Sequence, residues 1–212
     1  VQLHETYYNG DSKTPYVINE KRLITSFWGN SAVPEHILDL GYYLNNVSAS
    51  SLDDAIEDGD TLSVFFYQDA TVDGHLTYYD CYSYFENNSV VTQQNVATNF
   101  TLYRINSSDS TRVEIDGTDE AYTGLSVSFV EPKGTPGSDI GAKVNENGQF
   151  SHTFTSPGTY YLSVTGYVAN TIKNWNTGET YNVSAPIVPP LCKVTVLSAE
   201  KYATYESAQK YV

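Results

Sequence analysis

From Asp60 onward the chain repeats one pattern, in which short runs of alternating apolar and polar residues are separated by turns rich in Gly, Pro and Asn. In the clearest run, Leu125–Phe129, apolar residues alternate with serines, so one face of a strand is apolar and the other carries hydroxyls. Strands of this length and spacing are typical of a β-sandwich. We therefore predict a mainly β protein with a sandwich over residues 60–198.

The turn residues divide this region into eight predicted strands. They span 61–68, 76–85, 100–105, 112–115, 125–130, 148–154, 159–168 and 191–197. The turn at Pro157-Gly158 joins the sixth run to the seventh, and we expect these two to pair as a hairpin.

The segment 1–59 has a different pattern. Strand-like runs at 4–9, 16–18 and 23–28 precede a predicted helix over 31–45, in which Ser31 is the N-cap and Pro34 lies in the first turn. Its apolar face would consist of Ile37, Leu38, Gly41 and Leu44, and a short helical turn is expected at 51–56. We predict a small α+β segment, either separate or sharing a sheet with the sandwich. Residues 199–212 form a linker or a short helix.

Charge and composition limit the partners. The 212 residues carry 11 basic and 25 acidic side chains, a net charge of −14, which would be repelled by nucleic acid or an anionic membrane surface. No stretch approaches the ~18 apolar residues of a membrane span. We expect no nucleic-acid partner and no membrane insertion. The composition is polar, poor in Lys and rich in Tyr, Asn and Thr, as expected of a secreted or surface-displayed protein.

Cys81 and Cys192 are the only cysteines, and both lie in strand-like runs. They are either joined in a disulfide or two buried thiols, because pairing does not follow from sequence alone. Two cysteines so far apart lack the spacing of a zinc site.

Two runs resemble segments of large surface proteins of gut Gram-positive bacteria. They are SLDDAIEDGDTLSVFFYQD…YYDCYSYFE over 51–86 and NENGQFSHTFTSPGTYYLSVTGY over 145–167. In such proteins small α+β and immunoglobulin-like modules stand beside carbohydrate-binding or adhesive domains. The resemblance implies an immunoglobulin-like sandwich, extracellular display and no cofactor. It suggests a polysaccharide ligand of the polysaccharide-binding or starch-adherence type, with starch or another glucan bound, and neighbouring modules in a longer protein.

The acidic residues do not point to an enzyme. Glycoside hydrolysis needs two carboxylates that face one cleft, one of them with a raised pKa. Asp53-Asp54 and Asp58-Gly59-Asp60 lie in turns, where carboxylates are normally solvated. The four histidines have unrelated surroundings, no serine lies in a nucleophile elbow, and His152 fits the face of a sheet. We therefore predict no catalytic residues.

Two acidic loops raise the question of calcium. One contains Asp69, Asp73 and Gly74, and the other contains Asp116, Asp119 and Glu120. Calcium needs six to eight oxygen ligands, more than either short loop provides. We interpret both as acidic turns, with a structural calcium as the alternative.

Trp175 gives the best ligand signal. It lies in a polar loop that also contains Lys173, Asn174, Asn176 and Glu179. An exposed indole can stack on a pyranose while amides and charged groups bind its hydroxyls. The alternative is that Trp175 folds back as a plug over the end of the sandwich.

Trp28 follows an alternating run and precedes Gly29, and it is a second candidate contact. Together these residues lead us to expect a non-catalytic cell-surface carbohydrate-binding module. The alternative is a structural or adhesive spacer module with a protein ligand or none. An affinity screen on glycans separates the two hypotheses.

Overall fold

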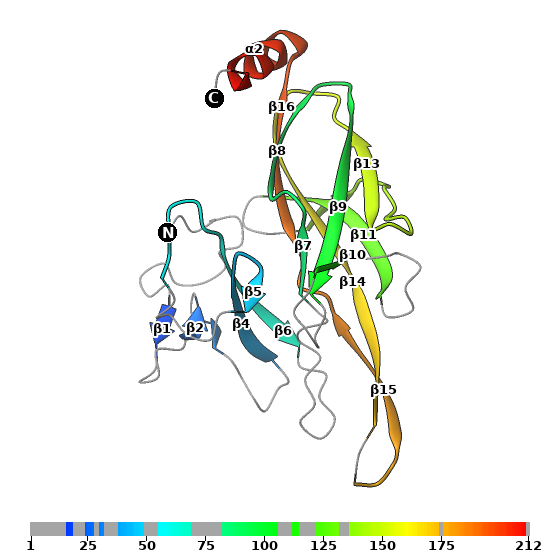
Figure 1. Cartoon of the computed structure of the whole chain (residues 1–212). Coiled ribbons are helices and arrows are strands. Elements are labelled where there is room, and N and C mark those ends of the chain that lie inside the picture. The colour runs from blue at the N-terminus through cyan, green and yellow to red at the C-terminus, as the bar shows by residue number, and fades with distance from the viewer. Residues whose placement is uncertain are drawn as a thin grey trace.

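The computed structural model describes residues 16–18, 24–27, 30–31, 38–48, 55–68, 82–105, 112–114, 122–131, 136–173 and 176–210. Within these ranges the protein is mainly β (Figure 1). The strands are β1 (Tyr16–Ile18), β2 (Ile24–Phe27), β3 (Asn30–Ser31), β4 (Leu38–Leu44), β5 (Val47–Ser48), β6 (Leu62–Gln68), β7 (Ser83–Phe85), β8 (Ser89–Gln93), β9 (Ala97–Ile105), β10 (Arg112–Glu114), β11 (Tyr122–Val130), β12 (Pro136–Asp139), β13 (Gln149–Thr153), β14 (Gly158–Lys173), β15 (Thr180–Pro186) and β16 (Leu191–Leu197). The helix α2 spans Ala199–Gln209.

Two sheets pack face to face around the main core. The larger sheet has the order β12-β11-β14-β16-β8, with β15 also paired to β14. The smaller sheet has the order β10-β9-β13, with β7 also paired to β9. Buried apolar residues from both sheets form one continuous cluster that includes Phe100, Leu102, Phe150, Val127, Leu162, Val164, Val194 and Val196. Each fully buried side chain of this kind stabilises the fold by roughly 1.5–3 kcal/mol.

The predicted strand register is confirmed in the sandwich. Val127 on β11 and both Leu162 and Val164 on β14 are fully buried, and Phe129 packs against the core. Val127 lies directly opposite Val164, and Phe129 opposite Leu162, because β11 and β14 are antiparallel neighbours. The apolar phase of each run is therefore the phase that faces the other sheet.

The predicted hairpin between the runs at 148–154 and 159–168 is wrong. Strand β13 pairs with β9, whereas β14 pairs with β11, β15 and β16. The chain between β13 and β14 therefore crosses from one sheet to the other, and Phe154 in this connection is buried in the core. Local turn residues do not distinguish a hairpin from such a crossing.

The predicted helix over 31–45 is also wrong, because Asn30–Ser31 forms β3 and Leu38–Leu44 forms β4. The seven residues of β4 pair with the seven of β6 in antiparallel register. Gly41 lies opposite Phe65, and a Cβ there would come within 2.5 Å of the Phe65 ring. Pairing with a strand distant in sequence overrides the helical spacing of the local apolar residues.

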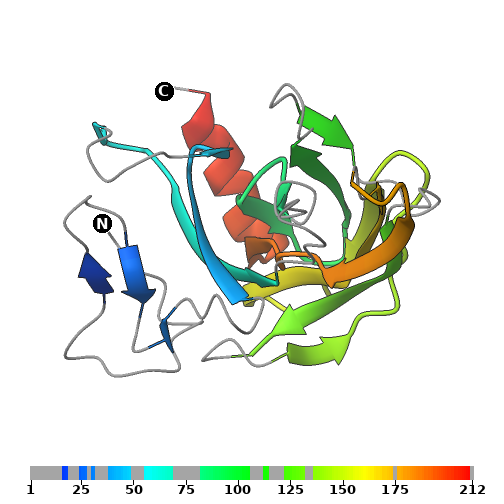
Figure 2. The same ribbon diagram turned by 90° about the horizontal axis from the view of Figure 1, so that it is seen from below.

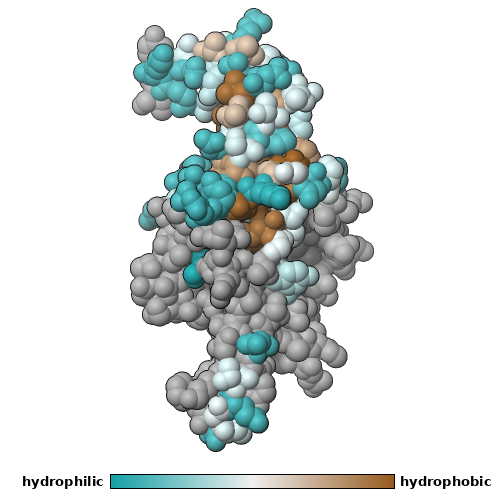
Figure 3. Space-filling model, turned by 90° about the vertical axis from the view of Figure 1, so that its right-hand side faces the viewer, coloured by the Kyte–Doolittle hydropathy of each residue, from teal (hydrophilic) through white to brown (hydrophobic). Residues whose placement is uncertain are grey.

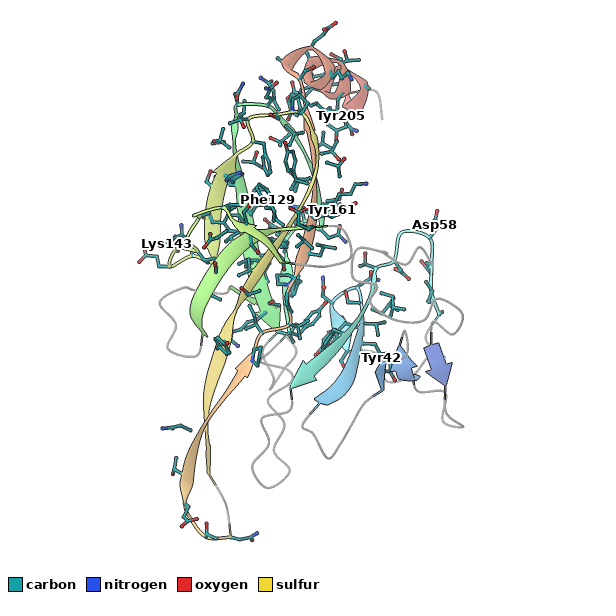
Figure 4. The ribbon with its side chains drawn as sticks, turned by 180° about the vertical axis from the view of Figure 1, so that it is seen from behind. Tyr42, Asp58, Phe129, Lys143, Tyr161 and Tyr205 are labelled. Atoms are coloured by element: carbon teal, nitrogen blue, oxygen red, sulfur yellow. The ribbon has the colours of Figure 1, made fainter. Side chains whose placement is uncertain are left out.

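Strands β4 and β6 pair across the turn at Asp58-Gly59, so residues on both sides of position 59 share one sheet. This sheet, of order β5-β4-β6, lies beside the sandwich, and the small sheet β1-β2-β3 lies on its outer side (Figure 2). Figure 4 labels Tyr42 on β4 and Phe129 within the sandwich.

Helix α2 follows β16 directly and has no buried residue. Ser198 is its N-cap, with the side chain accepting a hydrogen bond from the Lys201 N–H at 3.4 Å. The helix lies at the opposite end of the sandwich from the β14–β15 hairpin (Figure 1). Among the described residues, no helix is both long enough and apolar enough to cross a membrane.

Candidate functional site

The β14–β15 hairpin extends beyond the sandwich. The first part of β14 pairs with β16 and β11, and its last part, from Tyr167 to Lys173, pairs with β15 (Figure 1). The root of the hairpin is anchored, since the Ile187 N–H donates to the Gly166 carbonyl at 3.0 Å and Ile187 is buried. This two-stranded ribbon is therefore attached to the sandwich at its root by this hydrogen bond and by the buried Ile187 side chain.

The tip of this hairpin is described over residues 176–180, and all five of these residues are exposed to solvent. Lys173 and Thr180 form its last cross-strand pair, and Asn176, Thr177 and Glu179 are exposed in the loop. Figure 3 colours the described residues at this lower end of the molecule from white to teal.

A local hydrogen-bond pair shapes the loop. The Thr177 hydroxyl donates to Glu179 Oε2 and accepts from the Glu179 N–H, both at 3.3 Å. Gly178 between them has φ +76°, which a residue with a side chain rarely adopts. This turn holds a hydroxyl and a carboxylate side by side at the end of the ribbon.

Three of the site residues predicted from sequence lie at this end of the hairpin. Asn176 and Glu179 are in the loop, and Lys173 is the last residue of β14. Trp175 and Asn174 lie outside the described residues, so the platform and plug hypotheses for Trp175 both remain predictions.

Trp28 also lies outside the described residues. The strand that precedes it, β2, ends at Phe27 in the small sheet at the other side of the molecule from the hairpin tip (Figure 1). The segments that flank the two tryptophans therefore do not form one site.

Two titratable groups considered for catalysis, Asp60 and His152, make contacts that support the fold. The Asp60 carboxylate accepts hydrogen bonds from Asn45 Nδ2 and the Glu57 N–H, both at 2.7 Å, and these bonds lower its pKa. A general acid needs the opposite shift. His152 packs edge-on against the rings of Phe129 and Phe154, and burial lowers its pKa.

Cys192 carries a free, buried thiol, which donates to the Asn87 carbonyl at 3.2 Å. Cys81 lies outside the described residues, and the structure shows no disulfide at Cys192. Both acidic loops considered for calcium also lie outside them. The part of the chain that the structure describes holds no group of three or more His, Cys, Asp or Glu side chains arranged for a metal ion.

A small depression lies beside β9, lined by residues 85–87, 90 and 99–101. Its volume is about 20 Å³, enough for one water molecule and far too small for a sugar ring. A sugar therefore cannot bind in this depression.

No known family model matches this chain, and no curated protein is similar to it.

Sequence analysis missed one residue of the hairpin, Tyr167. It is 53% exposed at the root of the ribbon, although the run containing it was predicted as a strand. Leu162, Val164 and Gly166 are buried, so the period-two pattern carried forward from Leu162 and Val164 would have placed Tyr167 on the outer face.

Proposed function

We propose that this protein is a non-catalytic, extracellular carbohydrate-binding module whose contact surface is the tip of the β14–β15 hairpin. The observation that carries the proposal is the exposed polar turn at Asn176–Glu179, raised above the sandwich on a ribbon with an anchored root. Amide, hydroxyl and carboxylate groups are the partners that sugar hydroxyls need. Trp175 would supply the stacking surface.

We also propose that the sandwich is immunoglobulin-like. The order β12-β11-β14-β16-β8 matches the strands C′-C-F-G of such a fold with one further strand added at the G edge, and β7-β9-β13 matches A-B-E. The crossing from β13 to β14 then corresponds to the connection from E to F. Cys192 lies on the strand that corresponds to G, so it does not occupy a cysteine position of an antibody domain.

The ligand that we propose is starch or another glucan. We propose that the chain binds it as one module of a bacterial surface protein. The support is the resemblance of two segments to such proteins, together with the acidic charge of −14, which favours a neutral polysaccharide. An open tip with one stacking ring gives weak binding, because a stacked ring contributes about 1 kcal/mol. Repeated modules on one surface would supply avidity.

The alternative is a structural or adhesive spacer. Its support is the arrangement of the hairpin tip and α2 at opposite ends of the sandwich, which suits a module that separates two neighbours (Figure 1). A spacer of this kind needs no ligand at the tip.

Native affinity electrophoresis in gels containing starch, xylan or β-glucan tests the proposal. We expect at least one glucan to retard the protein, and we expect Trp175→Ala and Asn176→Ala to remove most of the retardation. Glu206→Ala, an exposed residue of α2 far from the tip, is the matched control and should migrate as the wild type. Retardation by none of the three glycans would support the spacer.

A further inference from the structure

One face of the β14–β15 ribbon continues from the tip back to Tyr167. In antiparallel strands, directly paired residues point to the same face, and so do residues two apart on one strand. Tyr167 pairs directly with Pro186. Asn182 and Thr180 lie four and six residues before Pro186 on β15, so they share its face. All four of these residues are exposed. We call Tyr167, Pro186, Asn182 and Thr180 the ribbon face.

The ribbon face contains both ring-bearing and hydrogen-bonding side chains. It combines a phenol ring and a proline ring with an amide and a hydroxyl. Four large apolar side chains are exposed among the described residues, and Tyr167 is the aromatic one. The other three are Val47, Ile56 and Val96. An exposed ring beside amide and hydroxyl groups is suited to a sugar, whose faces are apolar and whose edges are hydroxylated.

The length of the ribbon face sets the size of the ligand. Six residue steps separate Tyr167 from Lys173, the partner of Thr180, and a strand rises about 3.3 Å per residue. The face is therefore roughly 20 Å long before the tip loop begins. A ligand that covers this length contains several consecutive sugar rings, and one terminal sugar ring is too short to cover it.

We propose that the ribbon face is a second binding subsite, which takes an extended neutral polysaccharide running from Tyr167 towards the hairpin tip. The inference rests on the proposed function and adds the form of the ligand to it. Tyr167 stacks on one ring near the root, Asn182 and Thr180 bind hydroxyls along the ribbon, and the tip binds the far end. Polyanionic chains are disfavoured because the protein carries a net charge of −14.

Isothermal titration with linear glucan oligosaccharides of three and seven units, of α and of β linkage, tests this subsite. We expect the wild type to bind the longer ligand more tightly. Tyr167→Ala should weaken binding of the seven-unit ligand by about 5–10-fold, the equivalent of one lost stacking contact, and change binding of the three-unit ligand little. Asn182→Ala should act in the same direction, and Tyr167→Phe should retain the wild-type affinity.

Tyr205→Ala on α2 is the matched tyrosine control and should bind as the wild type. Thermal unfolding of each variant shows that it is folded. Equal affinity of wild type and Tyr167→Ala for the long ligand would overturn the subsite while leaving tip binding intact. Equal loss for both ligand lengths would overturn the extended path. Preferential binding of polygalacturonate would overturn the neutral ligand, and a wild type that binds no glycan would overturn both this inference and the proposed function.

Discussion

The ring of Tyr43 on β4 stacks on the ring of Tyr82, with 4.0 Å between centroids and 5° between planes. Phe65 on β6 packs against both rings. The Tyr82 hydroxyl donates to Asn46 Oδ1 at 2.8 Å, and the Tyr82 backbone forms a bridge with Val188 at the base of the sandwich. One tyrosine therefore joins the β5-β4-β6 sheet to the sandwich.

Replacing Tyr82 should destabilise the whole protein. Tyr82 is buried, and truncation of a buried aromatic residue to Ala costs about 3–5 kcal/mol. Tyr82→Phe keeps the stacking and loses the hydrogen bond to Asn46, so we expect a loss of about 1 kcal/mol. Urea unfolding followed by fluorescence measures both values. A Tyr82→Ala loss no larger than that of Tyr82→Phe would show that the stacking does not join the two parts.

Asn45 should be important for the β4–β5 turn. Its φ of 51° is left-handed, its Nδ2 donates to Asp60 at 2.7 Å, and its Oδ1 accepts from the Thr61 N–H at 2.9 Å. Asn45→Ala loses both bonds and places an alanine in a strained conformation, so we expect the Tm to fall by roughly 4 °C. Asn45→Gly loses the same bonds without the strain and should lower the Tm less. Equal falls in Tm for Asn45→Ala and Asn45→Gly would show that the left-handed backbone conformation of residue 45 does not contribute to the loss.

The Cys192 thiol should be protected in the folded protein. It is fully buried, and burial raises its pKa to about 12, so it forms little thiolate at neutral pH. We expect iodoacetamide to leave Cys192 unmodified in the native protein and to alkylate it in urea without a reductant, as judged by peptide mass. Alkylation in urea only after reduction would instead demonstrate a disulfide with Cys81.

Stability should decline in alkaline solution. Burial raises the pKa of both Cys192 and Tyr82 to about 12, from ordinary values of 9.0 and 10.0. From pH 9 upward the unfolded chain therefore releases protons that the folded chain keeps, and the free energy of unfolding falls by up to about 1.4 kcal/mol per pH unit for each group. Guanidinium unfolding at pH 7, 9, 10 and 11 measures this decline.

The matched control for this pH series is Cys192→Ala. Without the thiol, the decline should begin near pH 10, where the unfolded-state phenol of Tyr82 titrates, instead of near pH 9. A stability that is constant or rising between pH 9 and 11 in the wild type would contradict the assignment of both groups.

Part of the candidate site followed from sequence. The polar loop around Trp175 was recognisable because its residues lack apolar neighbours, and the structure exposes its described members Asn176 and Glu179. Tyr167 was missed because the period-two pattern of Leu162 and Val164 was not carried forward to the end of the run. The burial of Leu162 and Val164 confirms which phase faces the opposite sheet, and Tyr167 lies in the other phase.

The sequence by itself determined part of the strand content, because alternation of apolar and polar residues is a local property: β11, β14 and β16 contain the runs predicted at 125–130, 159–168 and 191–197. Strands β8, β12 and β15 of the same sheet were not predicted. Only the tertiary structure decided which strands are neighbours. Leu38–Leu44 became a strand because β6 pairs with it and Gly41 makes room for Phe65, and β13 joined β9 instead of β14. Strand pairing satisfies backbone hydrogen bonds between segments far apart in the chain, and no short window of sequence contains both partners.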